Sequence, residues 1–230
     1  MNVHDSQVEL RSAWRRAEIA AWFALVAHLL AALALLVLLR DGLDTNPDAS
    51  ARLRYIAGHR AAWIGGWLTW HAASLSIVIF IILTALAAKS GARSALGRLA
   101  VACVIAAFAM DFTGQTLLIG FMPSAADPLA DAEFILRIHR IAVLLSGYAG
   151  NGLYTLATLL LAAQLWRESN ALMRLAGLTI GVSGAALSIA ALLNSADGMY
   201  WSNAILLPAI LVWLAGIALL ARQMARCGLT

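Results

Sequence analysis

Six long apolar segments dominate this sequence and limit the folds open to it. They are 18–39, 62–88, 99–122, 141–165, 175–194 and 203–221. A helix of roughly 20 apolar residues crosses the hydrocarbon core of a bilayer, and each segment reaches or nearly reaches that length. Hydrophobic residues make up 62% of the chain and charged residues 12%, whereas soluble domains carry about 45–50% and about 25%. Because so few charges cannot cover a soluble surface, the sequence predicts an all-α, polytopic transmembrane helix bundle of six spans, one domain covering 1–230.

The charged residues lie between the apolar segments and predict the orientation of the bundle. The side that holds both termini carries ten basic and four acidic residues, and the opposite side carries six and seven. Positive charge is retained in the cytoplasm, so both termini are expected to be cytoplasmic. The polar residues before the first segment are too many for a cleavable signal peptide, so the first span is expected to remain. The net charge of +4 thus reflects topology, and no nucleic-acid partner is expected.

Two longer external loops, 40–61 and 123–140, precede the second and fourth spans. Their Asp, Pro and Ala content predicts short interfacial helices or caps rather than separate domains. Trp63 and Trp67 follow the first loop and are interpreted as part of the aromatic belt at the membrane surface. Three further polar residues on this side are expected to be solvated: His59, His139 and Asp197.

Polar residues occur at similar depth in four neighbouring spans. At about 1.5 Å per residue, His28, Asp111 and Asn151 fall near the centres of their spans, and His71 lies near the middle of the second. Helical spacing places Gln115 on the same helix face as Asp111, and Tyr148 on the same helix face as Asn151. The pattern predicts a midplane site for a small ligand, an ion or a proton, formed by His28, His71, Asp111, Gln115, Tyr148 and Asn151.

Asp111 is the most informative of these residues because an acid is costly at this depth. An Asp at the centre of a membrane helix costs about 2.5–3.5 kcal/mol on insertion scales. Such residues face the protein interior or a wet cavity and mark functional sites. We expect Asp111 to be the titrating group of the site, with His71 or His28 as its partner.

Several functions remain open at this stage. The midplane site is compatible with a carrier or a sensor, although no Gly- or Pro-broken helices support a secondary transporter. His28, His71 and Asp111 are the candidate ligands if the protein binds a divalent metal, and the two histidines are the candidates for a haem. No catalytic motif is present, so a membrane enzyme acting on lipid or isoprenoid substrates is less expected. A structural or assembly subunit, in which the polar groups only hold helices together, is the remaining alternative.

The order of spans and loops resembles that of uncharacterised bacterial six-span membrane proteins of the domain-of-unknown-function type. The shared layout is one span, an external loop, two helical hairpins separated by another external loop, and a final span. The resemblance implies a bacterial cytoplasmic membrane, in agreement with the Ala-, Leu- and Arg-rich usage typical of a high-GC bacterium. It implies no catalytic or binding residue. The expected partners are the lipid bilayer, a small-molecule ligand and further copies of the chain in a homo-oligomer.

Overall fold

The computed structural model describes residues 3–88, 94–126 and 131–227. Within these ranges the regular elements are all helices. Three charged residues that entered the orientation argument lie outside the described residues: Lys89, Arg93 and Asp127.

Five of the described helical segments are long and apolar enough to cross a membrane, which makes this a multi-pass membrane protein. They contain α1 (Val3–Ala34), α3 (Arg60–Ala87), α4 (Ser94–Gly120), α7 (Ala171–Leu193) and α8 (Ala196–Cys227). These segments overlap the predicted spans 18–39, 62–88, 99–122, 175–194 and 203–221.

The remaining predicted span, 141–165, is divided among three consecutive elements. These are α5 (Ala132–Val143), the π-helical segment η5 (Leu144–Gly150) and α6 (Asn151–Gln164). The residues at both junctions keep right-handed helical backbone angles, so the chain stays helical from 132 to 164. The π segment is the reason that no single α-helix here reaches the length of a span.

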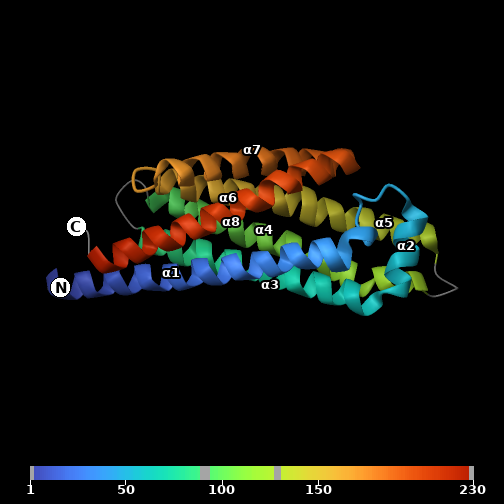
Figure 1. The fold of residues 1–230 in the computed structure, drawn as a ribbon, viewed down its shortest axis with the longest axis horizontal. Coiled ribbons are helices and arrows are strands. Elements are labelled where there is room, and N and C mark those ends of the chain that lie inside the picture. Colours follow the sequence, from blue (N-terminus) through green and yellow to red (C-terminus); the bar gives the residue numbers. More distant parts are fainter. Residues whose placement is uncertain (1–2, 89–93, 127–130, 228–230) are drawn as a thin grey trace.

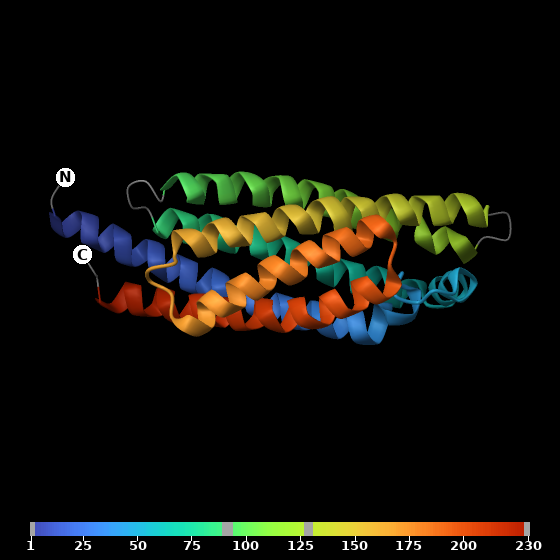
Figure 2. The same ribbon diagram turned by 90° about the horizontal axis from the view of Figure 1, so that it is seen from above.

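The long helices form a closed ring. Going round it, α1 packs against α3, α3 against α4, α4 against α6, α6 against α7, α7 against α8, and α8 against α1. Figures 1 and 2 show these helices running side by side along the longest axis of the molecule. The start of α1 and the end of α8 lie together at one end of the bundle, which we call the terminal end (Figure 1).

The opposite end, which we call the cap end, holds the short helices. It contains η2 (Arg40–Gly42), α2 (Ala49–Gly58), η4 (Met122–Ala126) and α5 (Figure 1). Asp48 begins α2 by accepting a hydrogen bond from Ala51 N, and Asp131 begins α5 in the same way. The prediction of short helices or caps in loops 40–61 and 123–140 is confirmed for the described residues.

Trp63 belongs to the core of this cap and not to an aromatic belt. Its side chain is 0% exposed, and its indole N–H donates to the carbonyl of Leu118 at 2.9 Å. The hydrogen bond joins α3 to α4 where both helices enter the cap. The interpretation of Trp63 as an aromatic-belt residue is therefore wrong. The short helices of the cap cover its indole, and the sequence of the loop did not show that they would.

The outside of the ring is apolar. Large aliphatic side chains such as Leu36, Val37 and Val182 are exposed by 64%, 70% and 74%. Soluble monomers rarely expose contiguous apolar patches of this kind. Outward-facing apolar helices are the arrangement that contact with a lipid bilayer requires.

The half of the ring near the terminal end is tightly packed. Small residues of α1 and the rings of Phe80 and Trp213, 5.5 Å apart, are part of its core. Gln164 donates from Nε2 to the carbonyl of Ala88 at 3.1 Å and so ties α6 to α3. This packed half forms the floor beneath the cavity described below.

Candidate functional site

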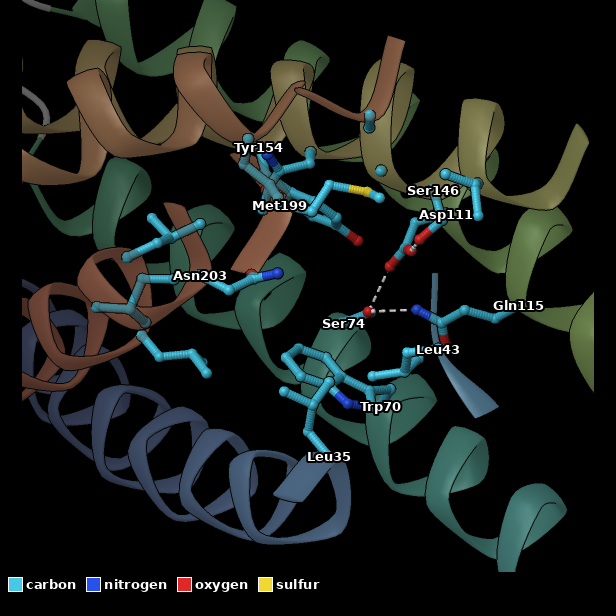
Figure 3. Close-up of a pocket in the computed structure, with 18 of the residues that line it drawn as sticks. Leu35, Leu43, Trp70, Ser74, Asp111, Gln115, Ser146, Tyr154, Met199 and Asn203 are labelled. Atoms are coloured by element: carbon cyan, nitrogen blue, oxygen red, sulfur yellow. Dashed lines mark hydrogen bonds between the residues drawn. The ribbon is translucent and has the colours of Figure 1, made fainter. Parts of the chain in front are cut away.

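A cavity of about 240 Å³ lies inside the ring, between the packed half and the cap. All six long helical segments contribute to its walls: for example, α1 supplies His28, α3 supplies Ser74 and α8 supplies Asn203. Leu43, Asp44 and His139 line it from the cap. Figure 3 shows side chains from several helices converging on this space.

Asp111 of α4 is the central polar group of the cavity and is 5% exposed. Ser74 of α3 donates its hydroxyl hydrogen to Asp111 Oδ2 at 2.5 Å, and Ser146 of η5 donates to Oδ1. Gln115, one turn along α4, donates from Nε2 to Ser74 Oγ at 3.3 Å. A continuous hydrogen-bonded chain thus runs from Gln115 through Ser74 and Asp111 to Ser146 (Figure 3).

This chain accommodates either protonation state of the acid. An ionised carboxylate only accepts hydrogen bonds, so both serines then donate to it. A protonated carboxyl group also donates one, and a serine hydroxyl can turn to accept it because hydroxyls are both donors and acceptors. The contacts of Asp111 therefore survive the gain or loss of a proton without movement of the helices.

The π segment brings Ser146 to the acid. A π-helix takes extra residues per turn and is often found at functional sites. Two glycines allow the close approach. A Cβ on Gly150 would lie 3.1 Å from Asp111 Cβ, and one on Gly114 would lie 2.7 Å from the carbonyl oxygen of Ala142. Glycine at these positions lets α4 and η5 come near enough for the hydroxyl of Ser146 to reach Asp111.

Four buried polar atoms on the cavity-lining side chains have no hydrogen-bond partner among the described residues. They are Trp67 Nε1, Trp70 Nε1, Gln115 Oε1 and the hydroxyl of Tyr154. The hydroxyl of Tyr154 lies near enough to Ser74 and Asp111 to interact with both, but it does not reach either of them with the geometry of a hydrogen bond. Buried polar groups in native proteins are almost always paired, so several unpaired ones around one cavity need an explanation.

Of the predicted site residues, His28, Asp111, Gln115 and Asn151 line this one cavity. His28 is 6% exposed, and its Nδ1–H donates to the carbonyl of Ala24 at 2.8 Å. That bond leaves Nε2 as the nitrogen of the ring that is available to a ligand.

Asn151 has a structural contact in addition to its place in the wall. Its amide nitrogen donates to the carbonyl of Gly184 at 3.0 Å and to Ser188 Oγ at 3.2 Å, both on α7. These bonds hold α6 against α7. Both amide N–H groups of Asn151 thus already have partners inside the protein.

The structure places His71 and Tyr148 outside the group of cavity-lining residues. The ring of His71 packs edge-on against Phe112 with centroids 4.5 Å apart, and its Nδ1–H donates to the carbonyl of Trp67 at 3.2 Å. Tyr148 is 43% exposed on the outside of the helix. The hydrogen-bond donors to Asp111 are serines, and His71 interacts with the acid only electrostatically.

His28, His71 and Asp111 were the candidate ligands if the protein binds a divalent metal. Within the described ranges, no group of three or more His, Cys, Asp or Glu side chains is arranged to hold a metal ion. The three residues come from different helices, and only two of them line the cavity. A haem between the histidines stays a prediction.

Asp44 and His139 form a buried polar cluster at the cap end of the cavity, together with Arg52. Asp44 Oδ1 lies 3.3 Å from His139 Nδ1 and is also paired with Arg52 Nη1. His139 is 2% exposed, so the expectation that it is solvated is wrong. Burial lowers the pKa of His139, Asp44 opposes this effect, and Arg52 adds to it.

Several residues of the site were not among the six predicted site residues, including Ser74, Ser146, Tyr154 and Asp44. Serine and tyrosine are common in membrane helices, and an Asp in a loop is ordinarily solvated, so none carries a sequence signal of its own. The usable signal was the run of small residues around Ser146, Ser-Gly-Tyr-Ala-Gly, in the middle of an apolar segment.

The interpretation of the cavity depends on its own chemistry. Each contact described above follows from the fold of this chain. No protein-family model matches this sequence, and no curated protein or solved structure is significantly similar to it.

Proposed function

We propose that this chain is a six-span protein of a bacterial cytoplasmic membrane that binds a small molecule in its central cavity. Asp111 is the proton-exchanging group of that site. The protein acts as a carrier or a sensor. The observation that carries the proposal is the set of four unpaired buried polar atoms around the cavity that contains the acid.

The alternative of a purely structural subunit does not account for these atoms. A polar group that only holds helices together has its partners inside the protein, as the amide nitrogen of Asn151 does. An unsatisfied buried group costs about 1–3 kcal/mol. Several such groups on the side chains around one cavity are better explained by a ligand or ordered water that pairs with them.

The sixth span and the orientation rest on two observations. The helical segment 132–164 lies between α4 and α7 in the ring, and the chain begins and ends at the same end of the bundle (Figure 1). An even number of crossings returns the chain to the side on which it started. The excess of basic residues on that side favours the cytoplasm.

Topology is tested with single-cysteine variants and a membrane-impermeant maleimide on intact cells. One variant carries Ser50→Cys in α2 with both native cysteines replaced by serine, and the other retains only Cys227. We expect labelling of the first in intact cells and of the second only after permeabilisation. Labelling of both in intact cells would contradict the six-span arrangement.

Ligand binding is tested with three two-ring probes of similar size. They are the hydrocarbon 2,3-dimethylnaphthalene, the neutral dicarbonyl 2,3-dimethyl-1,4-naphthoquinone and the cation 1-naphthylmethylammonium. Met199→Trp fills the cavity, and Met110→Trp adds the same ring at an exposed position of α4. We expect at least one probe to raise the Tm of the purified wild type and of Met110→Trp but not of Met199→Trp. If no probe does so, the proposed binding function is refuted.

A further inference from the structure

The unpaired atoms of the cavity specify the kind of molecule that would satisfy them. Three are donors, namely the indole N–H groups of Trp67 and Trp70 and the hydroxyl of Tyr154, which can also accept. Among these four atoms, only Gln115 Oε1, on a side chain 2% exposed, is purely an acceptor; His28 Nε2 is a further acceptor in the wall. A ligand that pairs with this set must present chiefly oxygen acceptors.

The charge of the cavity excludes anions. No Lys or Arg is among the residues that line it, whereas Asp111 and Asp44 both do. Asp44 is already paired with Arg52 and His139. A carboxylate or phosphate ligand would therefore meet Asp111 with no cation to offset the repulsion, at a depth where an unpaired charge is expensive.

An ammonium ligand is a stronger competitor, because tryptophan faces and an acid are the usual surroundings of such cations. An ammonium group has donors and no acceptor, however. It would leave both indole N–H groups unpaired, and both oxygens of Asp111 already accept hydrogen bonds from serines. The observed donors thus favour an uncharged ligand over a cationic one.

The rest of the wall determines the body of the ligand. Leu35, Leu43, Ile77, Leu187 and Met199 are among its aliphatic side chains. Binding pockets of this composition enclose an apolar body and orient it with a few polar contacts. A sugar or another molecule with hydroxyls on every side would leave most of them unpaired against this surface.

We infer that the cavity takes an uncharged, membrane-soluble carbonyl compound of the quinone type, whose carbonyl oxygens accept from Trp67, Trp70 and Tyr154. The inference rests on the proposed function, since it names the ligand class of the same cavity. The apolar ring or tail lies against the aliphatic wall. Gln115 Oε1 accepts a hydrogen bond from a hydroxyl of the reduced quinone or from a water beside the quinone carbonyl.

The test compares the three probes on the wild-type protein in detergent. We expect the naphthoquinone to bind at least about ten-fold more tightly than the hydrocarbon of the same shape, because a net hydrogen bond contributes roughly two- to ten-fold in affinity and more than one is formed. The methyl groups of this quinone block addition of cysteine thiols to its ring. Equal affinities for the two, or preference for the ammonium probe, would overturn the carbonyl assignment while leaving a binding cavity in place.

Variants that remove one donor each locate the contacts. Trp67→Phe and Trp70→Phe keep an aromatic ring but lose the second ring of the indole together with its N–H group, whereas Tyr154→Phe loses only the O–H group. Each is expected to weaken quinone binding by about two- to ten-fold more than it weakens hydrocarbon binding, because the hydrocarbon responds only to the lost ring contacts. Trp201→Phe, at a position 65% exposed, is the matched control and should change neither. Unchanged quinone affinity in all three donor variants would refute the assignment, and absence of binding by every probe would refute the proposed function with it.

Discussion

Replacement of Asp111 by asparagine and by alanine separates the proton-exchanging role from a structural one. An asparagine has nearly the same shape as the acid. Its amide oxygen can accept from one serine, and its amide nitrogen can donate to the hydroxyl oxygen of the other. Both contacts with Ser74 and Ser146 are thereby retained, and we expect the free energy of unfolding to change by less than about 1 kcal/mol.

Alanine retains neither contact. It leaves two hydroxyls without their acceptor in a buried site, and an unsatisfied buried group costs about 1–3 kcal/mol. Because a serine in a helix can turn toward a carbonyl of the preceding turn, the low end of this range applies to each. We therefore expect Asp111→Ala to lower the free energy of unfolding by about 2 kcal/mol, and Asp111→Asn by much less.

The assays are thermal unfolding of the purified protein and infrared difference spectroscopy between two pH values. The wild type should show a carboxyl C=O band that changes with pH and that is missing from Asp111→Asn. Equal destabilisation in both variants would show that the charge itself holds the helices, and the proton-exchange role would then fail. The same role fails if the infrared difference spectra of the wild type and of Asp111→Asn are identical.

Three further predictions concern the packing and the cap. Gly184→Ala should destabilise the protein by about 1–3 kcal/mol, because the added Cβ would lie 2.1 Å from a threonine oxygen of α6. The control Gly65→Ala, with open space around it, should be neutral or stabilising. Equal melting temperatures of the two variants would refute the close approach. Arg140 donates to two carbonyls at the end of α7, so Arg140→Ala should lower the free energy of unfolding by about 1–3 kcal/mol. Arg137→Ala removes only an exposed ion pair and should change it by less than about 1 kcal/mol when both variants are unfolded with denaturant. The pKa of His139 is lowered in the folded state, so the unfolded chain binds the extra proton first and stability should fall as the pH drops below about 6.5; His139→Gln should flatten this slope in Tm measured against pH, and an unchanged slope would contradict the assignment.

The helical spans and the presence of a buried acid could be predicted from the sequence, because both depend only on which residues follow one another within a single helix. The number of apolar residues in a row determines whether a helix can cross a bilayer, and five predicted spans coincide with long apolar helices. The cost of an acid in a membrane likewise depends on depth alone, which is why Asp111 could be identified before its neighbours were known.

The partners of Asp111 could not be found in that way. A span read with 3.6 residues per turn places Tyr148 and Asn151 on one face, three positions apart. The π segment η5 winds more residues into each turn, so Tyr148 lies outside while Ser146 and Asn151 line the cavity. His71 has the expected depth but faces Phe112, since depth says nothing about rotation about the helix axis.

The sequence by itself determined a helical membrane protein with an acid at mid-depth, since hydrophobicity and the cost of charge act on each helix separately. Only the tertiary structure decided that Ser74 and Ser146 bind the acid, that Asp44 and His139 lie buried at the cap end, and that unpaired donors surround one cavity. These contacts join residues from different helices. They depend on helix rotation, on a local π turn and on glycines that permit close approach, which are properties of packed helices together and of no single segment.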